Sequence, residues 1–122
     1  MPDKPVTCEV RYHVDLGRIA EFEAYAQIWI ELIERHGGTH HGYFLPRDRP
    51  ETAGLSFSGI GKDGADNIAI ALFTFPDENT YQRYRERVAT DPDGIAANAR
   101  FSGDPPFISY ERFFLTPVLR AT

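Results

Sequence analysis

The segment from Asn67 to Pro92 constrains the fold most strongly, because its hydrophobic pattern changes period within it. Residues 68–75 are apolar at every position except Thr74, and they form two alternating sets. One set is Ile68, Ile70 and Leu72, and the other is Ala69, Ala71, Phe73 and Phe75. A strand with apolar side chains on both sides is typical of one that is covered on both faces.

A helix is predicted directly after this strand. Pro76 ends the strand and Asp77 is a natural N-cap residue. Tyr81, Tyr84 and Val88 then recur at helical spacing. Thr90-Asp91-Pro92 ends the run, because proline disfavours helical backbone in the residue before it.

Composition restricts the class of protein. The 122 residues are 42% hydrophobic, which predicts a single domain over residues 1–122. The net charge is −5 and the basic residues form no run, which argues against nucleic-acid binding. One cysteine excludes an internal disulfide framework, and no apolar stretch approaches the roughly twenty residues needed to cross a membrane. The first residues resemble no signal or transit peptide, so we expect a cytoplasmic protein.

The remaining elements follow from the same rules. Val6–Val14 alternates as a strand, and a helix begins at Leu16 after Asp15 and ends at Gly37-Gly38. Further segments are a strand over 39–45, a long loop over 47–66, a short helical turn over 93–101 and a strand over 107–115. This order predicts an α+β fold of the ferredoxin-like βαββαβ type.

The same topology predicts a homodimer. Two right-handed crossovers place both long helices on one face of the sheet. We expect Phe73 and Phe75 to lie on the other, uncovered face. A second copy of the sheet is the simplest cover for them.

Short motifs spread along the chain resemble those of the NIPSNAP family. They are Glu9-Val10-Arg11, Gly42-Tyr43-Phe44, Phe73-Thr74-Phe75-Pro76, Tyr84-Arg85, Asp91-Pro92 and the segment from Glu111 to Pro117. The resemblance implies a dimeric α+β barrel, an architecture shared with small cofactor-free monooxygenases, muconolactone isomerases, haem-degrading enzymes and aldoxime dehydratases. Ala71 stands where the family often has a histidine, which argues against histidine-centred chemistry on that strand.

Glu9, Arg11 and His13 are the candidate catalytic residues. They share one face of a central strand, which would be the interior of a barrel dimer. A Glu9–Arg11 pair beside His13 could shift the histidine pKa through physiological pH, as proton transfer requires. The alternative is a purely structural pair of opposite charges.

Four further residues are candidate ligand contacts: Phe73, Tyr43, His41 and Glu111. His41 and Tyr43 share a face in a regular strand. The face that Glu111 takes on the last strand is left open by the pattern.

No metal site is expected from His36, His40 and His41. Neighbouring strand residues point to opposite faces, so His40 and His41 cannot bind one ion from a regular strand. His36 in the last turn of a helix is explained by the helix dipole. No cofactor is expected either, since the G-x-G-x-x-G match at 59–64 neither follows a clear strand nor opens a helix.

The sequence favours a protein that binds a small apolar or aromatic metabolite in the barrel cavity. Its chemistry would be proton abstraction, isomerisation or cofactor-free oxygenation, with His13 as base and Arg11 stabilising an enolate. The alternative is a non-catalytic binding or protein-interaction module. A cavity of a few hundred Å3 would favour the first interpretation. We also expect the loop over 47–66 to be mobile and to border the cavity entrance.

Overall fold

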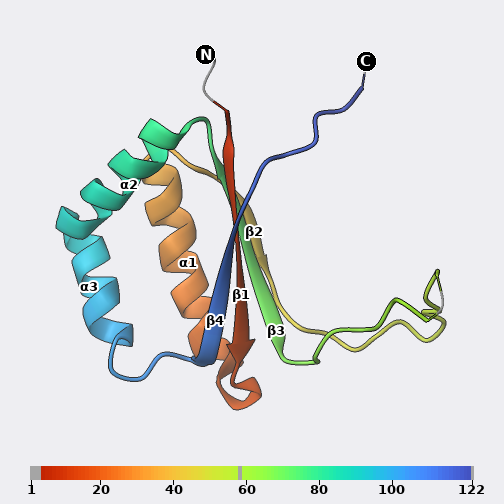
Figure 1. The fold of residues 1–122 in the computed structure, drawn as a ribbon. Helices are drawn as coiled ribbons and strands as arrows, with labels where there is room; N and C mark the ends of the chain where they lie inside the picture. The colour runs from red at the N-terminus through yellow and green to blue at the C-terminus, as the bar shows by residue number, and fades with distance from the viewer. Residues whose placement is uncertain (1–3, 58, 122) are drawn as a thin grey trace.

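The computed structural model describes residues 4–57 and 59–121 as a four-stranded sheet with its helices on one side (Figure 1). The strands are β1 (Val6–Val14), β2 (Thr39–Phe44), β3 (Ile68–Phe75) and β4 (Phe107–Leu115). The helices are the 3-10 turn η1 (Leu16–Arg18), α1 (Ile19–Arg35), α2 (Glu78–Thr90) and α3 (Pro92–Phe101). The sheet order is β2-β3-β1-β4, and each neighbouring pair is antiparallel. The α+β, ferredoxin-like prediction is therefore confirmed.

The predicted helix starts rest on side-chain caps. Asp15 accepts a hydrogen bond from the backbone N–H of Gly17 at 2.9 Å, and Asp77 accepts one from Thr80 at 2.6 Å. Such caps satisfy backbone donors that have no partner inside the helix. After α1, Gly37 takes a φ of 102°, a conformation that glycine adopts without steric cost.

The chain forms one more helix than the two long ones expected. The predicted short turn over 93–101 is the ten-residue helix α3. Asp91 ends α2 and also caps α3, by accepting a hydrogen bond from the backbone N–H of Asp93 at 2.9 Å. Pro92 then occupies the first turn of α3, where the missing N–H has no helical partner to lose.

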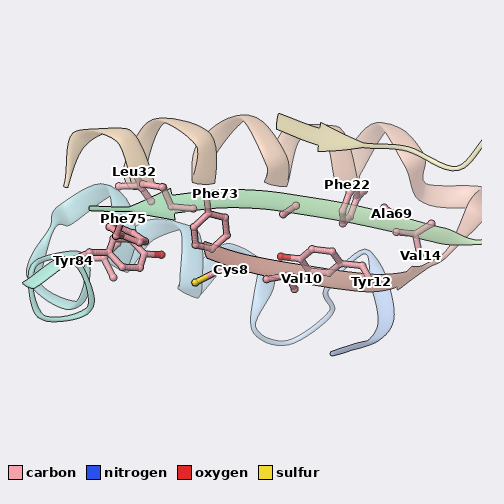
Figure 2. Close-up of a cluster of buried hydrophobic side chains, with 13 residues drawn as sticks. Cys8, Val10, Tyr12, Val14, Phe22, Leu32, Ala69, Phe73, Phe75 and Tyr84 are labelled. Atoms are coloured by element: carbon pink, nitrogen blue, oxygen red, sulfur yellow. The ribbon is translucent and has the colours of Figure 1, made fainter. Parts of the chain in front are cut away.

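The core lies between the sheet and the helices (Figure 2). From β1 it takes Cys8, Val10, Tyr12 and Val14, and from β3 Ala69, Ala71, Phe73 and Phe75. Phe22, Leu32 and Ile33 of α1 and Tyr84 and Val88 of α2 cover them.

The prediction that Phe73 and Phe75 lie on the uncovered face is wrong. Phe73 pairs with the core residue Cys8 across the β1–β3 register, and both phenylalanines are buried on the helix side. The pattern could not decide this, because both faces of β3 are apolar. The register with β1, whose two faces differ in polarity, sets which face of β3 meets the helices.

The face of the sheet away from the helices carries apolar side chains and one ion pair. Ile70, Leu72 and Phe113 are partly exposed there, with Phe44 and Leu115 more exposed. Arg11 binds Glu9 through Nε and lies 4.7 Å above the Phe113 ring. We expect a second copy of the chain to cover this face, because packing against an identical sheet would remove its exposed apolar side chains from water.

Replacing Leu72 by Arg should weaken this self-association at least tenfold, because it buries an unpaired charge in the interface. Light scattering coupled to size exclusion would measure the mass across a dilution series. Gln82→Arg, on the exposed side of α2, is the matched control and should leave the mass unchanged. A wild-type protein that is a monomer at micromolar concentration would contradict the expected dimer.

The connection between β2 and β3 projects away from the helices (Figure 1). Residues 45–67 form neither helix nor strand wherever the structure describes them. Phe57 and Ile60 are 81% and 86% exposed in this loop. Its predicted mobility stays a prediction.

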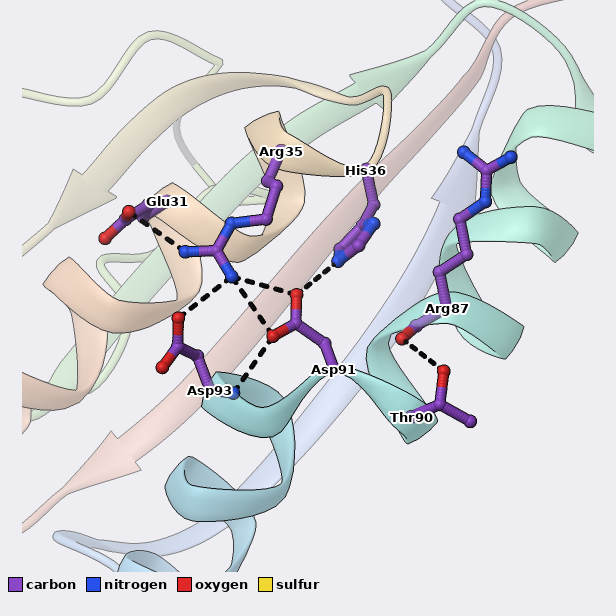
Figure 3. Close-up of polar contacts among 7 residues, drawn as sticks. All are labelled: Glu31, Arg35, His36, Arg87, Thr90, Asp91 and Asp93. Atoms are coloured by element: carbon purple, nitrogen blue, oxygen red, sulfur yellow. Dashed lines mark hydrogen bonds and ion pairs between the residues drawn. The ribbon is translucent and has the colours of Figure 1, made fainter.

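An ionic network fastens the end of α1 to the junction of α2 and α3 (Figure 3). His36 Nε2 donates to Asp91 Oδ2 at 2.7 Å, and Arg35 Nη1 donates to the same carboxylate at 2.9 Å. Arg35 also pairs with Asp93 and Glu31 at 3.0 Å each. The hydrogen bond from His36 foremost, then that from the backbone N–H of Asp93 and the Arg35 guanidinium, lowers the pKa of Asp91 to about 2.

We predict that Asp91→Asn lowers the melting temperature at pH 7 by about 4 °C. A carboxyl whose folded pKa lies below its unfolded value of about 3.9 stabilises the fold above that pH. The stabilisation disappears as the pH falls through about 4 to 2, so the two melting temperatures should converge there. Circular dichroism melts at several pH values would test this. Glu23→Gln, which removes an exposed carboxylate from α1, is the control and should show no such convergence.

Candidate ligand cleft

A cleft of about 670 Å3 opens between the sheet and the helices. Its walls come from β1, β2, β3 and β4 on one side and from α1, α2, α3 and the segment after α3 on the other. The lining residues are Cys8, Val10, Tyr12, Tyr25, Trp29, Ile33, Tyr43, Phe73, Tyr81, Tyr84, Arg85, Val88, Ala89, Ala97, Asn98, Phe101, Ser102, Pro105, Phe107, Tyr110 and Arg112. The volume exceeds that of a bicyclic or tricyclic aromatic molecule and falls in the range of ligand pockets.

Aromatic side chains dominate these walls. All six tyrosines of the chain and its single tryptophan line the cleft, although they come from five different elements. Tyr12 lies at the centre, with its ring 4.9 Å from that of Phe107 and 5.9 Å from that of Tyr25, both edge to face. Such a wall offers flat apolar surface together with hydroxyl groups.

Two alanines of β3 leave room for the large rings beside them. Tyr12 pairs with Ala69 in the β1–β3 register, and Tyr43 pairs with Ala71 in the β2–β3 register. Their rings approach to 6.2 Å. A small residue beside a large one on the same sheet face allows close packing without strain. Ala71, where the family resemblance leads one to expect a histidine, is fully buried among the other residues of the core.

The tyrosine hydroxyls of the inner wall stay protonated at neutral pH. Burial raises the pKa of Tyr12, Tyr25 and Tyr43 well above the ordinary value, and it raises the pKa of Tyr84 to about 12. The hydroxyls of Tyr12 and Tyr25 lie 3.4 Å apart. These groups are therefore hydrogen-bond donors and not bases.

His40 is a half-buried neutral histidine next to the cleft wall. Its ring stacks on Tyr43 and Phe73, at 5.0 and 5.5 Å between ring centroids. The backbone N–H of Gly42 donates to its Nδ1 at 2.9 Å, so in the neutral ring Nε2 carries the proton. Burial lowers the pKa of His40 to about 4, which keeps the ring neutral.

Two buried N–H donors have no acceptor in the described part of the chain. They are Nε1 of Trp29, which lines the cleft, and Nε2 of His40. An unsatisfied buried donor costs about 1–3 kcal/mol. A small shift of the Trp29 ring toward a ligand oxygen would satisfy one of them. The sequence pattern revealed neither donor, because it pointed to His40 only as a metal ligand and did not single out Trp29.

The structure divides the predicted site residues between the two faces of the sheet. Phe73 and Tyr43 line the cleft. The β1–β4 register places Arg11 opposite Glu111 and His13 opposite Ser109, on the face without helices. Glu9 and Arg11 do form the expected ion pair, but it lies on that face, away from the cleft. The residues that were predicted to form one site therefore lie on two opposite faces of the sheet.

The prediction that His41 and Tyr43 share a face is wrong. The β2–β3 register skips a residue between His40 and Gly42, so β2 bulges at His41. His41 Nε2 lies 2.9 Å from Oγ1 of Thr74, whose hydroxyl also contacts Thr7 on the helix-free face. Gly42 has a φ of 117°, and a glycine in this conformation signals a bulge that simple alternation ignores.

The loop over 47–66 was predicted to border the cavity entrance, but none of its described residues, 47–57 and 59–66, lines this cleft. Across the described residues, no three His, Cys, Asp or Glu side chains gather as a metal site would require. No helix in the described ranges is long and apolar enough to cross a membrane.

The profile of the NIPSNAP family matches residues 9–120 of the chain. The chain belongs to the NIPSNAP family. No curated protein sequence matches it significantly. Its fold is similar to that of a NIPSNAP family protein from Agrobacterium tumefaciens, with a TM-score of 0.65 and 18% identity over 95% of this chain and 88% of the other.

Two more solved structures place the NIPSNAP chain among similar folds. An uncharacterised NIPSNAP domain protein from Burkholderia xenovorans has a TM-score of 0.66 and 19% identity, over 96% of this chain and 98% of the other. SnoaB, a cofactor-independent oxygenase from Streptomyces nogalater, has a TM-score of 0.59 and 18% identity, over 96% of each chain. At these identities the likeness is one of fold.

We predict that Tyr12, Tyr25, Tyr43 and Tyr84 do not ionise at about pH 10, where exposed tyrosines do. A raised folded pKa stabilises the fold below the unfolded value, and this stabilisation is lost as the pH rises above it. Tyrosinate absorbance should therefore include a late step that coincides with unfolding. Tyr43→Phe should reduce that late step and leave the absorbance change near pH 10 intact. The reverse result would show that the Tyr43 hydroxyl is open to solvent.

Proposed function

We propose that this NIPSNAP protein binds a small, planar aromatic molecule in the cleft between the sheet and the helices. The observation that carries the proposal is the convergence of every tyrosine and the single tryptophan on one open space of about 670 Å3. Rings pack edge to face or offset against flat ligands, and their hydroxyl and indole groups can bind ligand oxygen atoms. The proposal keeps the ligand class expected from the sequence and moves its site to the helix side.

The polarity of the cleft favours a ligand that carries acceptor oxygens. The hydroxyls of Tyr12 and Tyr25 remain protonated, and Nε1 of Trp29 lacks an acceptor within the described residues. Protonated donors in a partly dry site stabilise a carbonyl or an enolate. Isomerisation and cofactor-free oxygenation of a carbon acid both pass through such an anion.

The cleft holds donors but no evident general base. His40 is neutral with its proton on Nε2, and the lining residues include no aspartate or glutamate. His13, the base expected from the sequence, and its neighbour Glu9 belong to the other face of the sheet. A reaction in this cleft would therefore suit a substrate that ionises readily in water. The fold similarity to the oxygenase SnoaB supports only the compatibility of this architecture with such chemistry.

A non-catalytic interaction module is the second candidate. The observation that favours it is the projecting loop between β2 and β3, which exposes Leu55, Phe57 and Ile60. Solvent-exposed apolar side chains at a loop tip are typical of a contact surface. Under this alternative the cleft would bind aromatic probes no better than any apolar surface does.

We predict that 2-naphthamide, a neutral planar probe, binds one site per chain in isothermal titration calorimetry. Ala89→Trp should weaken this binding at least tenfold, because residue 89 is an exposed cleft-lining position on α2 where an indole would fill the space. Ala99→Trp is the matched control, since residue 99 is exposed on α3 and does not line the cleft. Binding that survives Ala89→Trp, or a wild type that binds neither 2-naphthamide nor its carboxylate analogue 2-naphthoate, would refute the proposal.

A further inference from the structure

The charged residues of the cleft are all of one sign. Arg85 of α2 and Arg112 of β4 line it, and no aspartate or glutamate among the described residues does. The whole chain has a net charge of −5. The charge of the cleft wall, with two guanidinium groups, therefore has the opposite sign to that of the whole chain. Such a local excess of positive charge attracts an anion.

Neither arginine is paired with an acid within the described residues. Four other arginines each form an ion pair with a carboxylate: Arg11, Arg18, Arg35 and Arg49. Arg85 contacts Tyr81, whose hydroxyl lies 3.4 Å from Arg85 Nη1.

Aromatic rings connect the two arginines across the gap between α2 and β4. The Tyr81 ring meets that of Phe114 edge to face at 5.6 Å. The Arg112 guanidinium lies 4.7 Å above the Phe114 ring. Arg85 and Arg112 therefore flank one pair of touching rings, one arginine on each side of the gap.

Both charges also act on groups deeper in the cleft. Burial raises the pKa of Cys8 to about 11, and the nearby charge of Arg112 opposes that rise. Burial likewise dominates the raised pKa of Tyr84, with the charge of Arg85 opposing it. The field of each arginine thus reaches the buried wall.

We propose that the cleft selects a planar aromatic carboxylate, whose ring lies among the tyrosines and whose negative charge is stabilised by the two arginines of the cleft wall, Arg85 and Arg112. This rests on the proposed function and adds the charge of the ligand to it. A guanidinium presents its N–H groups in a planar fork that matches a carboxylate. Two of them, without a competing acid, favour an anion over a neutral molecule of the same shape.

The test compares 2-naphthoate with 2-naphthamide, which share ring system and size and differ in charge. In calorimetry at pH 7.5 the wild type should bind 2-naphthoate at least tenfold more tightly than 2-naphthamide. Arg112→Gln and Arg85→Gln should each weaken the binding of 2-naphthoate far more than that of 2-naphthamide, and so remove most of this preference. Arg83→Gln, on the same helix but outside the cleft, should keep the preference.

The outcomes separate the two proposals. Equal affinity of the wild type for the two probes would overturn the carboxylate proposal and leave aromatic binding intact. Failure of both probes to bind would overturn the proposed function itself. A preference for 2-naphthoate that survives either glutamine substitution in a folded variant would also overturn the assignment, because the charge would then be recognised elsewhere. The two substitutions lie on different elements, α2 and β4. If one variant fails to fold, the other still tests the carboxylate proposal.

Discussion

The pairing of β1 with both β3 and β4 is the constraint on which the rest of the structure depends. β1 alternates Cys8, Val10, Tyr12 and Val14 on one face with Glu9, Arg11 and His13 on the other. Because its two faces differ so clearly, the register of its neighbours decides which of their side chains meet the helices. It buries Phe73 and Phe75 under α1 and α2, and it leaves Ile70 and Leu72 on the free face.

The same pairing separates two surfaces of different character. On the helix side, aromatic rings with protonated hydroxyls line a cleft whose wall includes no acidic side chain from residues 4–57 and 59–121. On the free side, apolar side chains surround the Glu9–Arg11 ion pair. The cleft suits a flat ligand with oxygen atoms, and the helix-free face suits packing against another copy of the sheet. Ligand recognition and assembly can therefore use opposite faces of one thin sheet.

The helices reach their places through local signals together with a long-range ionic network. Asp77 and Asp91 cap α2 and α3, and the Asp91 carboxylate also binds His36 and Arg35 at the end of α1. One carboxylate thus fixes both the start of α3 and its distance from α1. This matters for the cleft, since Ala97 and Asn98 of α3 form part of its wall.

The sequence by itself determined the order of the strands and helices, the capped helix starts and the family. These depend on local periodicity, on Asp15 and Asp77 at helix starts, and on motifs spread along the chain, all of which are present before any folding. Only the tertiary structure decided the site. The bulge at His41 reversed the face of one candidate, and the β1 register moved Phe73 into the core. The tyrosines looked like ordinary core residues on separate elements. Their convergence is a long-range property of sheet order and helix packing, which no local pattern encodes.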